Sequence, residues 1–82
     1  MGRYATEARR HADRIDHYHK HAGRLGYSQA EHHFHTLSGL VIRASRSKHD
    51  KNDVVIIQAL CETAETQMQE MKQREGDPAD NG

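Results

Sequence analysis

The fold of this chain is decided by residues 26–46, GYSQAEHHFHTLSGLVIRASR. Ser28 and Glu31 form the S-x-x-E pattern of a capping box, in which each side chain satisfies a free backbone N–H at the start of a helix. The apolar residues that follow recur at spacings of mostly three and four, on one helical face: Ala30, Phe34, Leu37, Leu40, Val41 and Ala44. This spacing predicts an amphipathic helix over residues 29–46.

The segment before this stretch carries an apolar stripe of the same kind. Its members are separated by three or four positions throughout: Tyr4, Ala8, Ala12, Ile15, Tyr18, Ala22 and Leu25. The pattern predicts a helix over residues 4–25. Gly26 suits the left-handed backbone that often follows a helix end, so we expect the first helix to stop near Leu25.

A third helix is predicted after residues 47–53, SKHDKND, where the periodicity breaks. Asp50, Asn52 and Asp53 are candidate N-caps for it. Its stripe predicts a helix over residues 53–75 and comprises Val54, Ile57, Leu60, Cys61, Ala64, Met68 and Met71. The run VVII is also compatible with a buried strand, but the helical spacing continues to Met71 and the chain offers no second strand to pair with it.

Together these stripes predict an all-α fold, a small three-helix bundle with up-down-up topology. Residues 1–76 are expected to form one domain, followed by a disordered tail at 77–82. The chain has 82 residues, of which 34% are hydrophobic and nine are alanine. Such a lean core suggests that a partner or a second copy adds buried surface.

Basic residues and histidines form a row on the outward face of each of the first two predicted helices. The row on the first helix comprises Arg10, Arg14, His17, His21 and Arg24, and the row on the second comprises His32, His35, Gly39, Arg43 and Arg46. Residues 1–48 hold nine Lys or Arg against four Asp or Glu, whereas residues 49–82 hold three against eight. The neutral total therefore hides a strong charge asymmetry, which bears on partners rather than on fold. The alternative is that the acidic third helix simply neutralises the two basic helices within the bundle.

Two features of the second helix favour docking over a plain solvated surface. Gly39 costs about 1 kcal/mol in a helix interior relative to alanine, and its missing side chain would let a partner approach the backbone. Ile42 flanks the row on the side away from the apolar stripe. Close helix packing at Gly39 is the alternative interpretation.

The start of the third helix is apolar almost all the way round. Val55 lies off the apolar stripe, and with Ile56 it predicts a contact between two copies of the chain, because an apolar surface of this kind is usually covered. The alternative is that Val55 is a single exposed valine, which needs no explanation.

The eight histidines allow three interpretations. Asp13, His17 and His21 lie one turn apart and form a candidate metal site, although no pattern supplies further ligands. His11, His19 and His33 border the apolar stripes and are expected to be hydrogen-bonded boundary residues. Because histidine titrates near pH 6.5, the two rows would also gain positive charge on acidification and bind anions more strongly.

Catalytic patterns are missing from the sequence. It has no Gly-rich phosphate loop, no nucleophile elbow and no H-E-x-x-H motif, and Cys61 lies on an apolar stripe, where a thiol is usually an inert small hydrophobe. The single cysteine and the lack of a long apolar run or signal peptide predict a cytoplasmic protein without a membrane partner. We therefore expect no enzymatic activity and no cofactor.

The leading functional hypothesis is a small helical binding module that docks on a larger protein or nucleoprotein assembly. It would act as an inhibitor, adaptor or regulator of the kind that phages and mobile elements often encode, an association rather than a derivation. The second hypothesis is nucleic-acid binding through the two basic rows, although residues that would read bases are scarce. The third is metal or pH sensing by the histidines.

Overall fold

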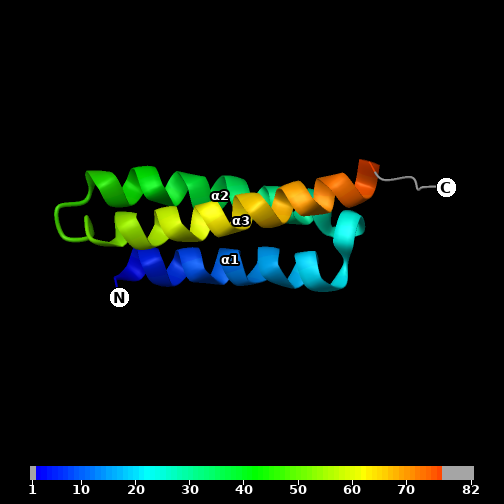
Figure 1. The fold of residues 1–82 in the computed structure, drawn as a ribbon. Helices are drawn as coiled ribbons and strands as arrows, with labels where there is room; N and C mark the ends of the chain where they lie inside the picture. Colours follow the sequence, from blue (N-terminus) through cyan, green and yellow to red (C-terminus); the bar gives the residue numbers. More distant parts are fainter. Residues whose placement is uncertain (1, 77–82) are drawn as a thin grey trace.

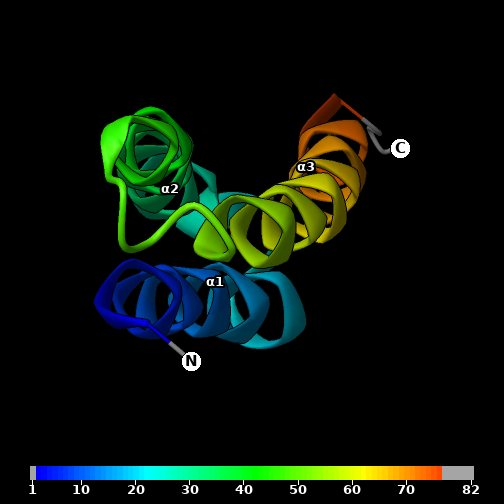
Figure 2. The ribbon, with the colours of Figure 1, turned by 90° about the vertical axis from the view of Figure 1, so that its left-hand side faces the viewer.

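The computed structural model describes residues 2–76, with side chains as far as Gln73. Helix α1 spans Arg3–His21, a short 3-10 helix η1 spans Gly23–Gly26, α2 spans Tyr27–Arg46 and α3 spans Asp53–Gly76 (Figure 1). The helices run up, down and up, and the end view shows them packed around a common axis (Figure 2). The predicted three-helix bundle is therefore confirmed.

The structure also settles the alternative for residues 54–57, because they lie inside α3 and the described part of the chain contains no strand. No helix among the described residues has an apolar run long enough to cross a lipid bilayer. The tail predicted at 77–82 lies outside the described residues.

The boundary between the first two helices differs from the prediction. Helix α1 ends at His21 rather than near Leu25, because the left-handed backbone occurs at Gly23, with φ of 53°, and not at Gly26, with φ of −94°. Gly26 is instead required for close packing. A Cβ on it would lie 2.9 Å from the Cβ atoms of Tyr18 and Ala22, so only glycine lets η1 fold back onto α1.

The predicted capping box at Ser28 and Glu31 is wrong. Helix α2 begins at Tyr27, with Gly26 in the N-cap position and no side-chain hydrogen bond at the cap. The reason is that η1 runs directly into α2, and the backbone N–H of Tyr27 already donates to the carbonyl oxygen of Arg24. Ser28 therefore lies inside the first helical turn, two residues after the N-cap position of Gly26.

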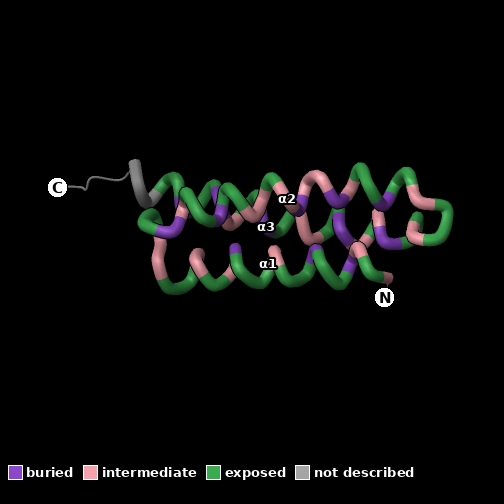
Figure 3. The backbone as a smooth tube through the Cα atoms, turned by 180° about the vertical axis from the view of Figure 1, so that it is seen from behind, coloured by how far each residue is buried: buried purple, intermediate pink, exposed green. Residues whose placement is uncertain are grey.

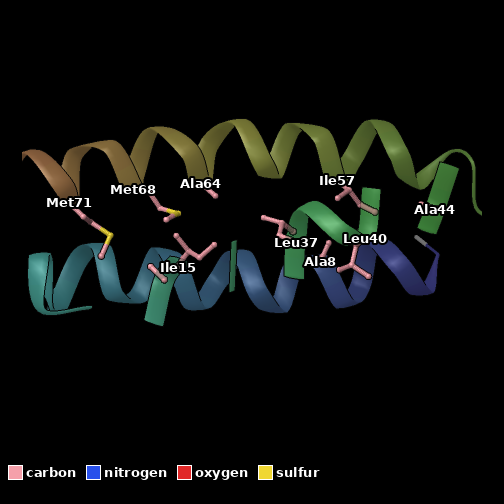
Figure 4. Packing of buried hydrophobic residues seen from close by; sticks show 10 residues of the cluster. Ala8, Ile15, Leu37, Leu40, Ala44, Ile57, Ala64, Met68 and Met71 are labelled. Atoms are coloured by element: carbon pink, nitrogen blue, oxygen red, sulfur yellow. The ribbon is translucent and has the colours of Figure 1, made fainter. Parts of the chain in front are cut away.

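The core contains few large side chains. The buried hydrophobic residues are Ala5, Ala8, Ile15, Ala30, Leu37, Leu40, Ala44, Ile57, Ala64, Met68 and Met71. They lie on the inward sides of the helices (Figure 3), and the larger side chains point into the space between them (Figure 4). Because five of the eleven are alanine, burial depends on six large residues, as the lean composition suggested.

An aspartate at the start of α3 caps the start of α1. Asp53 is the only buried charged residue among those described, with 4% of its surface exposed. Its two carboxylate oxygens accept hydrogen bonds from the backbone N–H groups of Gly2, at 3.2 Å, and Ala5, at 3.0 Å. A Cβ at position 2 would collide with this carboxylate, so a larger residue there would displace the Asp53 side chain. Asp53 was a candidate cap for its own helix, but its carboxylate caps a different one.

A polar bridge joins the other ends of α1 and α3. Asp16 accepts a hydrogen bond from the side-chain amide of Gln67 at 2.8 Å and pairs with Lys20 at 3.1 Å. The Lys20 hydrogen bond, together with that of Gln67, outweighs the effect of burial and lowers the pKa of Asp16 below its ordinary value. The stabilisation from this bridge is therefore present above the unfolded-state pKa and is lost as the pH falls through the lower folded-state pKa.

Candidate functional site

The predicted row on the first helix faces solvent along its whole length. Arg10, Arg14, His17 and His21 are exposed on α1, and Arg24 extends the row onto η1. Neither Arg10 nor Arg14 makes a hydrogen bond or an ion pair with any described residue. These two guanidinium groups are therefore available to a partner.

No ion pair among the described residues joins Arg10 or Arg14 to the acidic third helix. Within the described part of the chain, α1 and α3 are joined by an ion pair between His19 and Glu70, at 2.7 Å. The other two ion pairs join Arg3 to Asp50 and Lys20 to Asp16. The positive charges of Arg10 and Arg14 are therefore not cancelled by direct pairing with the described residues of α3.

The row on α2 is also exposed, apart from its glycine. His32, His35, Arg43 and Arg46 are exposed and Gly39 is half-buried. Ile42, beside the row, has 54% of its surface exposed. A Cβ on Gly39 would meet no atom within 4 Å, so close helix packing does not explain this glycine. An open backbone position beside an exposed isoleucine remains compatible with docking.

Replacing Gly39 by alanine is expected to stabilise the fold by about 1 kcal/mol, because the helix gains propensity without a clash. For a domain of this size, the melting temperature should rise by about 4–8 °C, measured by circular dichroism. Gly26→Ala is the matched control and should melt earlier, because its Cβ would lie 2.9 Å from Tyr18 and Ala22. If the melting temperature of Gly39→Ala were no higher than that of the wild type, the glycine would be structurally required.

Two histidines outside the rows join α1 to α2. Nδ1 of His11 lies 2.9 Å from Nδ1 of His33, and the ring of His33 also stacks on Tyr18 with centroids 6.2 Å apart. His32 of the α2 row lies beside His33, with centroids 6.1 Å apart. Burial, and after it the positive charges of His11, His32 and Arg14, lower the pKa of His33. Because the folded state resists protonating His33, acidification through the unfolded-state pKa weakens the fold.

An open groove of about 860 Å³ lies against this histidine pair. It is lined by Arg3, Thr6, Glu7, Arg10, His11, Asp13 and Arg14 of α1 and by His33 of α2. Of the predicted site residues, it brings together Arg10, Arg14 and Asp13. His17, His21, Arg24 and the predicted α2 row lie outside it.

The expectation that the boundary histidines are hydrogen-bonded is confirmed. His11 and His33 bond each other, and His19 bonds Glu70. Sequence periodicity placed each of them beside an apolar stripe, but it could not pair them across helices, because it does not give the register between α1 and α2.

The candidate metal ligands do not form a three-residue site. The rings of His17 and His21 do approach each other, with centroids 4.7 Å apart. Yet no three His, Cys, Asp or Glu side chains among the described residues are arranged to hold a metal ion, so Asp13 does not complete the set.

The residues predicted at a dimer contact differ in exposure. Val55 has 71% of its surface exposed, whereas Ile56 is half-buried. A contact between two copies through these residues stays a prediction. Cys61 is half-buried against the core, where burial, and after it the nearby Glu65, raise the pKa of its thiol and keep it protonated.

Comparisons of the chain with protein-family models, curated proteins and solved structures found no match. The function of the surface must therefore be argued from its own geometry and charge.

Proposed function

We propose that the protein is a non-enzymatic helical binding module that docks on an acidic surface of a larger protein or nucleoprotein assembly. Docking occurs through the α1 face, the exposed surface of α1 that carries Arg10 and Arg14. The main support is that Arg10 and Arg14 are exposed and pair with no acidic side chain among the described residues, although the chain holds as many acidic as basic residues. Unpaired guanidinium groups are well suited to carboxylates and phosphates, with which they form two parallel hydrogen bonds.

The shape of the molecule supports docking along a helix. The row follows α1 and borders the groove that His33 closes on the α2 side. Complementary charges on a partner would accelerate encounter and fix the orientation of the complex. The lean core adds to this, because a docked partner stabilises the folded state by mass action.

The test is affinity capture from cells of the native host with three matched baits. The wild-type chain and a control double variant, Lys51→Glu with Lys72→Glu, should capture similar amounts of the same partner. The double variant Arg10→Glu with Arg14→Glu should capture less of it, by a factor of about ten or more. The control carries the same change in net charge at exposed positions away from the α1 face. Thermal melts confirm that all three baits are folded.

The outcomes separate the alternatives. Equal capture by the α1 variant and the control would contradict docking through this face. Loss of the captured material on nuclease treatment would instead favour nucleic-acid binding through the same arginines, and its affinity should then fall steeply with salt.

A further inference from the structure

The contact between His11 and His33 joins two identical atoms. Their Nδ1 nitrogens are 2.9 Å apart, which is hydrogen-bonding distance. A neutral imidazole has one nitrogen that donates and one that accepts, so this contact is attractive only when one Nδ1 carries a proton and the other presents its lone pair. The pair therefore holds the α1–α2 junction together as long as one, and only one, of the two facing nitrogens carries a proton.

Protonation of both rings turns this attractive contact into a repulsive one. With both rings charged, each Nδ1 is a donor and the two N–H groups point at each other. On α1, the groove is lined by the charged residues Arg3, Glu7, Arg10, Asp13 and Arg14. Tyr18 of α1 stacks on His33 and His32 of α2 lies beside it, while no described residue of α3 lines the groove. The two donors then need a shared acceptor.

The net charge of the groove beside the pair becomes more positive when the histidines are protonated. With neutral imidazoles, its three arginines exceed its two carboxylates by one charge. Arg3 is directed toward Asp50, 3.9 Å away, so the available excess is smaller still. Two protonated imidazoles would raise the excess by two charges, and the groove would become strongly cationic only on acidification.

We propose that this groove is a proton-linked binding site for a tetrahedral oxyanion of the phosphate monoester class. One oxygen of the anion accepts hydrogen bonds from both Nδ1–H groups of His11 and His33, replacing the bond that the second proton abolishes. Arg10 and Arg14 neutralise the remaining oxygens from the same groove. Binding of the anion therefore takes up protons from solution. The inference rests on the proposed function, for which it names the chemical group that the α1 face recognises.

The first experiment is calorimetric titration of the wild-type chain with sulfate at constant ionic strength. Sulfate is the probe because its charge, unlike that of phosphate, is constant between about pH 5.5 and 7.5, so any change in affinity reports the protein. Affinity should be about tenfold or more higher at pH 5.5 than at pH 7.5, which corresponds to an average uptake of about half a proton or more per sulfate over the two pH units. Titrations in two buffers with different ionisation enthalpies should accordingly show net absorption of protons when sulfate binds.

The second experiment removes one of the two titrating rings but keeps the hydrogen bond. In His33→Asn, the side-chain amide can bond Nδ1 of His11 but cannot accept a proton, so sulfate binding should depend clearly less on pH than in the wild type. His35→Asn is the matched control, because His35 is exposed on the same helix and lines a different groove, between α2 and α3. It should behave as the wild type, and circular dichroism verifies that both variants fold.

The proposal is overturned if the wild type binds sulfate equally at both pH values, binds none at the lower pH, or absorbs no proton. Unchanged sulfate binding in Arg10→Gln, Arg14→Gln at the lower pH would overturn it as well. These measurements need no partner protein, so they are independent of the capture experiment. Sulfate binding without capture would contradict the docking function alone, and capture without sulfate binding would contradict the anion site alone.

Discussion

Leu37→Ala is expected to lower the free energy of unfolding by about 2–5 kcal/mol, the cost of deleting a large aliphatic side chain from a core. Leu37 is completely buried on α2, and its neighbours cannot fill the space, because almost half of the buried hydrophobic residues are alanines. A chain of 82 residues has a total stability of roughly 4–12 kcal/mol. The variant should therefore lose a large share of its stability, measured by urea unfolding.

Leu25→Ala is the matched control for this prediction. It is the same substitution, but Leu25 has 81% of its surface exposed on η1, so the change should stay within about 0.5 kcal/mol. Equal losses in the two variants would mean that Leu37 does not lie in the interior. A Leu37→Met variant, which conserves volume, should recover most of the lost stability.

Asp53→Ala is expected to destabilise the protein by about 1–3 kcal/mol, because it leaves two backbone donors at the start of α1 without their acceptor. The carboxylate accepts from the N–H groups of Gly2 and Ala5, and Ala5 is completely buried. Amide hydrogen exchange should accelerate at Ala5 more than at residues in the middle of α1. This local effect separates loss of the cap from a general loss of stability.

Two further variants complete the test of the cap. Asp53→Asn keeps one acceptor oxygen and should lose less stability than Asp53→Ala. Asp13→Ala removes an exposed carboxylate from α1, the helix that Asp53 caps, and should leave both the unfolding midpoint and the amide exchange rate of Ala5 unchanged. If the Ala5 amide exchanged its hydrogen at the wild-type rate in Asp53→Ala, Asp53 would not be the cap of α1.

The apolar stripes of the sequence were sufficient to predict the three helices and their order. Most stripe residues are buried or half-buried in the structure, and the helical interpretation of residues 54–57 is confirmed. Stripe spacing reports which face of a helix is buried and therefore predicts helices well. Leu25 is the exception, because Gly23 adopts a left-handed backbone and takes the chain out of α1 before the last repeat.

Helix ends were harder to predict, because competing backbone geometry decides them. Ser28 and Glu31 match a capping box in sequence, yet η1 satisfies the N–H of Tyr27 first. The cap that does form, Asp53 on α1, joins residues 51 positions apart. Local pattern cannot reveal such a cap, since the partner lies on another helix.

The candidate site was predicted in part. Exposure of the α1 arginines follows directly from the apolar stripe on the opposite side of the helix. The hydrogen bond between His11 and His33 depends on the register and rotation of α1 against α2, which the stripes leave undetermined. A polar residue beside an apolar stripe was the available signal, and it marked both histidines without pairing them.

The Asp53 cap also sets an order of events during synthesis of the chain. When α1 leaves the ribosome, the residue that satisfies its first backbone donors has not yet been translated, because it follows 48 residues after Ala5. The first turn of the nascent helix must therefore remain frayed and hydrated, since isolated helices of this length are marginal in water. It becomes fixed only when the start of α3 emerges and docks, which couples the first turn of α1 to the completion of the tertiary structure.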